Sequence, residues 1–155
     1  MANNEQTRQL VPQAEVDDIA RKVLTWANQF PEKPVAVILY EHILIDPATG
    51  DETAMKLMTI PGSFISKRYI LGGHKAEYNF QIVYRIKPGN SNDRRLKAVA
   101  ILNRFGDWAL ENRPSLGDGV NAIKVEPTTQ AALLQPYNDG YEDYLITLKL
   151  TYEVI

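Results

Sequence analysis

The sequence predicts an α+β fold, in which two helices pack on one face of a mainly antiparallel sheet. Two long stretches, residues 76–87 and 144–155, alternate between apolar and polar side chains, as strands with one buried face do. Two other stretches, residues 14–29 and 94–111, carry apolar residues at steps of three and four, as amphipathic helices do. Because each element has one apolar side, we expect the helices to cover the apolar face of the sheet.

The side chains expected to form the core follow from these two periodicities. The sheet face beneath the helices is predicted to consist of Tyr78, Phe80, Ile82, Tyr84, Ile146, Leu148, Leu150 and Tyr152. The helix stripes are Val16, Ile19, Ala20, Val23, Ala27 and Phe30 in the first helix, and Ala98, Ile101, Leu102, Phe105 and Ala109 in the second. Leu24 and Trp26 lie off the first stripe. Gly106 interrupts the second helix at a cost of ~1 kcal/mol relative to alanine, which a close approach to the sheet would explain.

The rest of the chain predicts shorter strands and loops. Residues 35–45 read as a strand buried on both faces at its start, and residues 53–60 as a returning strand that would complete a hairpin across the turn at 46–51. Residues 63–74 are expected to project from the core as a loop or short hairpin. Residues 122–126 predict a short strand, and residues 127–138 an irregular connection. We divide the chain into an N-terminal arm, residues 1–12, and a single domain, residues 13–155.

Composition excludes several classes of protein. The chain of 155 residues fits one domain, and its net charge of −2 argues against a dedicated nucleic-acid binder. It has no cysteine, which rules out disulfides and thiolate zinc sites. The polar N-terminus is unlike a signal peptide, and no apolar run reaches the roughly 20 residues of a membrane span. These features predict a soluble intracellular protein without a membrane partner.

The sequence contains no recognisable catalytic or metal-binding motif. His42 and His74 have no neighbours at the spacing of metal ligands, and no serine lies in a nucleophile motif. Carboxylates gather near the turn at residues 139–143, where we expect them to face water. We therefore predict no catalytic residue, no metal site and no cofactor.

Basic residues form two groups. Lys67 and Arg68 lie near the aromatic residues Phe64 and Tyr69, and a second group falls at residues 94–97. Cations next to aromatic rings can bind single-stranded nucleic acid. A nucleic-acid-binding module therefore remains an alternative from a different functional class, although solvated surface residues account for the same pattern.

Three segments of the second half carry a resemblance to a known family. They read ILNRFGDW at residues 101–108, VNAIKVEPTTQAALL at 120–134 and NDGYEDYLITLKLTY at 138–152. The chain from residue 78 onward resembles the small minor capsid proteins of tailed phages and prophages of Gram-positive bacteria, which are similar to tail terminators. The shared motifs are fold patterns rather than active-site signatures.

The resemblance implies a non-enzymatic protein of phage tail assembly that needs no cofactor. Tail terminators form a ring, usually a hexamer, which caps the tail tube and presents the surface that joins the head. The implied partners are other copies of the chain, the tail tube protein and the head–tail connector or other neck proteins. The implied location is the tail or neck of the virion, after assembly in the cytoplasm of the host bacterium. A different neck component, such as a connector or tail-completion protein, is the closest alternative.

A ring requires heterologous contacts, in which two different surfaces of each copy meet. Strands with unpaired edges can supply such contacts, and we expect residues 144–155 to form such an edge. The projecting segment at residues 63–74 is a second candidate. The residues predicted to face a neighbouring copy or the tail tube are Lys67, Arg68, Tyr69, His74, Tyr152 and Ile155.

Overall fold

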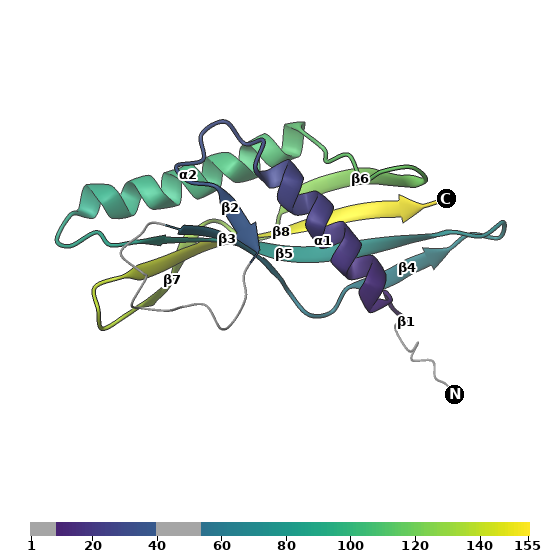
Figure 1. Cartoon of the computed structure of the whole chain (residues 1–155), viewed down its shortest axis with the longest axis horizontal. Helices are drawn as coiled ribbons and strands as arrows, with labels where there is room; N and C mark the ends of the chain where they lie inside the picture. The colour runs from purple at the N-terminus through teal and green to yellow at the C-terminus, as the bar shows by residue number, and fades with distance from the viewer. Residues whose placement is uncertain (1–8, 40–53) are drawn as a thin grey trace.

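A computed structural model describes residues 9–39 and 54–155 of the chain, and it confirms the predicted fold class. Helices α1 (Gln13–Ala27) and α2 (Asn92–Glu111) lie on one face of a mainly antiparallel sheet (Figure 1). The strands are β1 (Gln9–Leu10), β2 (Val37–Leu39), β3 (Ala54–Thr59), β4 (Phe64–Arg68), β5 (His74–Ile86), β6 (Val120–Pro127), β7 (Ala132–Pro136) and β8 (Glu142–Val154).

The two longest strands, β5 and β8, form the centre of the sheet. They pair antiparallel along their whole length, from His74 opposite Val154 to Ile86 opposite Glu142. The other side of β5 pairs with β4 and then β3, and these are extended by β1 and β2. The other side of β8 pairs with β6 and β7. Both long strands therefore lie inside the sheet.

The predicted core is confirmed. All eight side chains expected beneath the helices are buried, and an aromatic cluster joins them to both helices. The ring of Trp26 in α1 stacks on Trp108 in α2 at a centroid distance of 4.9 Å, and it meets Phe80 of β5 edge-on at 6.4 Å. Trp26 lies off the main stripe of α1, yet it is buried, and its Nε1 donates a hydrogen bond to the carbonyl oxygen of Asn112 at 2.5 Å.

The second helix lies very close to the sheet at Gly106, as its sequence suggested. A Cβ at this position would lie 2.9 Å from Pro127 Cγ and 3.0 Å from Ile146 Cδ1. Only glycine lets the helix backbone approach this closely. The helix begins at the cap residue Ser91, whose Oγ accepts a hydrogen bond from the backbone N–H of Arg94 at 3.2 Å.

The predicted sheet edge at residues 144–155 is wrong, because β8 is paired on both sides. The error has a physical cause in residues 120–136. The expected short strand extends over Val120–Pro127, and the stretch expected to be irregular contains β7. These two strands cover the margin of β8 and themselves form that edge of the sheet.

The predicted hairpin of residues 35–45 and 53–60 is also wrong. Strands β2 and β3 pair in parallel, with Val37 opposite Met55, whereas the two strands of a hairpin pair antiparallel. The expected burial of this strand on both faces is wrong as well, because Ile38 and Leu39 point to opposite faces of the short edge strand β2 and both are exposed, while Val37 is buried. The predicted turn at 46–51 and His42 lie outside the described residues.

Within the predicted N-terminal arm, residues 9–10 pair with β4.

A buried ion pair lies on the sheet face opposite the helices. Arg85 of β5 donates from Nε and Nη2 to the two carboxylate oxygens of Asp143 on β8, at 2.7 and 2.8 Å. The hydroxyl of Tyr137 donates to the same carboxylate at 2.7 Å, and Arg85 lies over the Tyr137 ring. This pair ties the two central strands together on their second face. Burial lowers the pKa of nearby Lys56, and the charge of Arg85 lowers it further.

Three of the eight tyrosines are expected to make stability fall in alkali. Burial raises the pKa of Tyr78 and of Tyr144 to about 12, and burial also raises the pKa of Tyr152. The neutral phenol is thus favoured in the folded chain, so this stabilisation is complete below pH 10 and is lost as the pH rises further. We expect the free energy of unfolding to drop above pH 10, by up to about 1.4 kcal/mol per pH unit for each tyrosine.

The measurement compares phenolate absorbance with far-ultraviolet circular dichroism across this range. The last tyrosines to ionise are expected to do so together with loss of the fold. Ionisation of all eight near pH 10, with the dichroism unchanged, would contradict the placement of these three side chains.

Candidate assembly surface

The hairpin of β4 and β5 extends beyond the rest of the sheet (Figure 1). Its turn is closed by hydrogen bonds from Gly72 N–H to the Tyr69 carbonyl and from Tyr69 N–H to the Gly73 carbonyl, both 3.2 Å long. Ile70 and Leu71 therefore occupy the two central positions of a β-turn. Gly72 and Gly73 follow with positive φ angles of 96° and 85°, which glycine adopts without strain.

The side chains of Ile70 and Leu71, which we call the hairpin tip, are fully in water. Their exposed fractions are 100% and 99%. Turn positions are usually filled by polar residues or glycine, and burying an aliphatic side chain of this size is worth about 1.5–3 kcal/mol. Two adjacent aliphatic side chains at the end of a projecting hairpin are therefore typical of a contact site.

The base of the hairpin is fixed to the body of the protein. Glu15 Oε2 of α1 accepts a hydrogen bond from the hydroxyl of Tyr152 at 2.6 Å and lies 2.9 Å from His74 Nε2. The hydroxyl of Tyr69 donates to Glu153 at 2.9 Å. These contacts connect the hairpin to α1 and to β8.

Gly73 brings the turn against the end of β8. A Cβ at this position would lie 2.2 Å from the carbonyl oxygen of Val154, a distance that no side chain tolerates. On the other strand, Arg68 Nε donates to Gln9 Oε1 of β1 at 2.8 Å. The hairpin is thus held from three sides, and its tip is presented on a rigid support.

A pocket of about 340 Å³ lies at the other end of β4. It is formed by β1, the start of α1 and the connection from β3 to β4. We call it the apolar pocket, and its lining residues are Leu10, Val11, Gln13, Val16, Thr59, Ile60, Pro61, Gly62 and Ser63. Leu10 is largely exposed at the pocket. The hydroxyl of Ser63 is buried and has no hydrogen-bond partner among the described residues.

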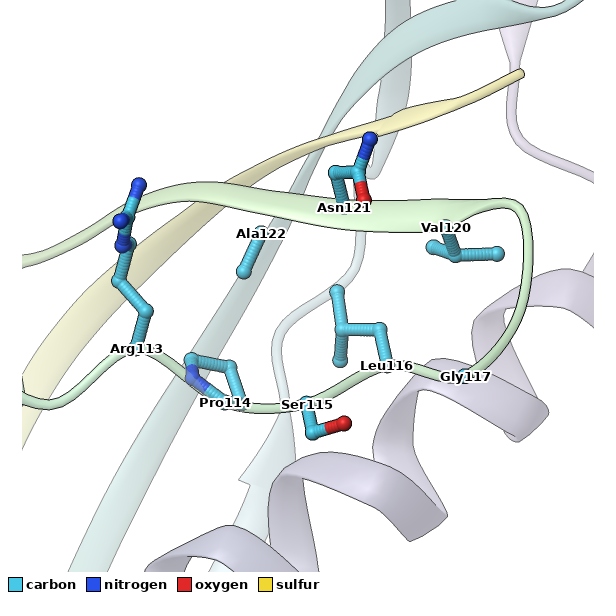
Figure 2. Close-up of a pocket in the computed structure, with 8 residues that line it drawn as sticks. All are labelled: Arg113, Pro114, Ser115, Leu116, Gly117, Val120, Asn121 and Ala122. Atoms are coloured by element: carbon cyan, nitrogen blue, oxygen red, sulfur yellow. The ribbon is translucent and has the colours of Figure 1, made fainter.

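A second pocket, of about 530 Å³, lies between the loop that follows α2 and strand β6. Figure 2 shows Leu116 directed into the gap between loop and strand, and Asn121 directed away from it. Arg113 is the single ionisable residue in the lining, and it donates a weak hydrogen bond to the Ile123 carbonyl at 3.4 Å. The lining thus offers no pair of groups for acid–base chemistry.

The structure brings most of the predicted interface residues together. Lys67, Arg68, Tyr69 and His74 surround the turn of the hairpin, and the end of β8 adds Ile155, which is exposed. Tyr152 differs, because its side chain is only 1% exposed and lies under α1 in the core. The candidate segment at residues 63–74 includes the hairpin tip, but the list of predicted interface residues left Ile70 and Leu71 out, and sequence reasoning missed the apolar pocket. The signal for the tip was present, since two aliphatic residues precede two glycines in an expected turn.

The described part of the chain holds no cluster of three or more potential metal ligands. Glu15, His74 and Tyr152 bring an acid, an imidazole and a phenol into contact, and this contact joins the hairpin to α1. None of the three residues lines either of the two pockets described above. The absence of a catalytic residue stays a prediction.

The two basic groups of the sequence do not form one stripe. Lys67 and Arg68 lie next to the start of β5, and α2 begins beyond its other end. Thirteen residues of strand separate them, roughly 40 Å at about 3.3 Å per residue. In the second group, Arg95 pairs with Glu142 at 3.0 Å.

No family model matches the sequence, and no curated protein matches it. Among the described helices, none is both long and apolar enough to cross a membrane.

Proposed function

We propose that this chain is a tail-terminator-like assembly protein, which caps the tube of a phage tail as a ring of identical copies and offers the surface to which the head is joined. The observation that supports this role most strongly is the rigidly held hairpin with two fully exposed aliphatic side chains at its tip. A surface of this kind suits a protein that acts by docking to other proteins.

The fold supports the same role. The helices and the two central strands form a complete core around an aromatic cluster, so the chain has a rigid body to carry contact surfaces. Strands β6 and β7 lie at one margin of the sheet, and among the residues that the structure describes no further strand pairs with them. Leu133 and Leu134 of β7 are about half exposed. Such edges can join neighbouring copies in a ring.

The test is electron microscopy of particles assembled by the source phage or prophage after deletion of this gene. Tail tubes of excess and variable length are expected, because nothing ends their growth, and the wild-type gene supplied in trans is expected to restore the normal length. Normal-length tubes without heads would instead indicate a connector. Normal particles would contradict any role in the neck.

The nucleic-acid alternative has its own test. A titration of the purified chain with DNA and RNA at several salt concentrations would show weaker binding at higher salt if phosphates were neutralised. We expect no binding at physiological salt, since the two basic groups lie far apart.

A further inference from the structure

We infer that the hairpin tip of one copy inserts into the apolar pocket of the next copy, so that each chain carries both halves of one heterologous contact. This inference rests on the proposed function, and it names the contact by which the ring would close. The occupant of the pocket is thus a second copy of this chain.

The two halves match in chemistry and size. The tip consists of two aliphatic side chains, and the pocket lining contains Leu10, Val16 and Ile60 among its apolar residues. An apolar cavity of about 150 Å³ is enough for a benzene-sized molecule. A pocket of about 340 Å³ therefore has room for both side chains of the tip.

The charges near the two surfaces are of opposite sign. Lys67 and Lys75 lie directly opposite each other across the hairpin, below the tip, and like charges in this position repel. Beside the pocket, the carboxylate of Asp17 accepts a hydrogen bond from the pocket residue Gln13 at 2.9 Å. Glu153 of β8 lies opposite Lys75 on its other side, and a neighbouring copy that places Asp17 near the two lysines would add a second negative charge.

The pocket also contains a polar group without a partner. The Ser63 hydroxyl is buried in the wall of the pocket, and the described residues offer it no hydrogen bond. Leaving such a group unpaired destabilises a protein. Because less than 1 Å² of this oxygen is accessible, a backbone group of an inserted turn would pair with it only if the wall of the pocket moves.

The contact cannot form within one chain. Ser63 directly precedes β4 and the tip follows it, and β4 has five residues, so pocket and tip lie about 20 Å apart at about 3.3 Å per residue. The tip of each copy must therefore enter a different copy. A contact between two different surfaces repeats around an axis, and it generates a ring when the rotation closes.

Cross-linking tests this contact directly, because the chain has no cysteine of its own. The double variant Leu71→Cys/Pro61→Cys carries one thiol on the tip and one at the pocket, and Pro61 is exposed. With a short bis-maleimide, this variant is expected to give a ladder of covalent oligomers, both as concentrated protein and in assembled particles. Each single variant is expected to give no cross-linked product. A mixture of the two single variants is expected to give covalent dimers and nothing larger, because each chain then carries one thiol.

The matched control is Leu71→Cys/Leu96→Cys, whose second thiol lies on an exposed position of α2. An equal ladder from the control would show random collision and overturn the inference. Dimers from Leu71→Cys alone would show tip-to-tip contact, and cross-links to the tube protein alone would show a different occupant. Either result would also overturn the inference. The absence of any cross-link, both in the concentrated protein and in assembled particles, would overturn it too.

Sedimentation equilibrium gives an independent measurement. Replacing both tip residues, Ile70→Ser/Leu71→Ser, is expected to weaken self-association by about 100-fold or more, while Leu96→Ser/Leu110→Ser on exposed positions of α2 leaves it unchanged. If the tip variant still forms rings and tails of normal length, the tip contact is wrong and the proposed function stands. If deletion of the gene leaves tails normal, the function is wrong, whatever the cross-linking shows about self-contact.

Discussion

Replacing Asp143 with alanine is expected to lower the free energy of unfolding by about 3–5 kcal/mol, the usual effect of breaking a buried ion pair. The Asp143 side chain is 4% exposed, and its carboxylate accepts three hydrogen bonds, two from Arg85 and one from Tyr137. Its bond to Arg85 raises the pKa of that guanidinium. Without the acid, Arg85 keeps its charge in a buried site and loses the carboxylate that lies against it.

Urea denaturation followed by circular dichroism measures this effect. The control Asp118→Ala removes an exposed acid and is expected to change stability by less than about 0.5 kcal/mol. The double variant Arg85→Met/Asp143→Leu removes both charges and is expected to lose less stability than Asp143→Ala alone. A loss below about 1 kcal/mol for Asp143→Ala would mean that the carboxylate does not hold Arg85 in this way.

Replacing Phe105 with alanine is expected to cost about 3–5 kcal/mol, because it leaves a cavity where both helices meet the sheet. The Phe105 side chain is 1% exposed. Its ring centroid lies 5.4 Å from that of Phe30 and 5.5 Å from that of Trp26. The loss therefore includes the burial of the ring and its edge-on contacts with Trp26 of α1 and with Phe30, which follows that helix.

The same helix offers a matched control for Phe105→Ala. Leu96 is 67% exposed, so Leu96→Ala removes an apolar side chain without opening a cavity, and a change of less than about 0.5 kcal/mol is expected. The comparison is made by urea denaturation at neutral pH. Equal losses for the two variants would contradict the packing of α2 through Phe105.

The elements that could be predicted from the sequence are those with one apolar and one polar side. The helices and strands β5 and β8 are long enough for their periodicity to identify both the element and its buried face. Strand β7 could not be predicted this way, because all five of its residues are exposed and no alternation marks them. The wrong expectation that β8 forms an edge had two sources: β7 was missed, and nothing in the sequence indicated that the expected strand at 122–126 pairs with β8.

The direction in which two strands pair, and the contacts between residues far apart in the sequence, leave no recognisable pattern in the local sequence either. Nothing in the alternation of β2 and β3 distinguishes a parallel pair from a hairpin, since the direction depends on the path of the connecting residues. Tyr152 was expected both in the core and at an interface, and its hydrogen bond to Glu15 places it in the core. The apolar pocket combines residues from two regions, 10–16 and 59–63, which only the folded chain brings together.

The most direct measurement of the central claim is a density map of the tail end, determined by electron cryomicroscopy with this chain present. We predict a closed ring of copies at the end of the tube, with the Ile70–Leu71 tip of each copy seated against residues 59–63 of the next. A tube whose end carries no such ring, or a chain found elsewhere in the particle, would contradict the claim.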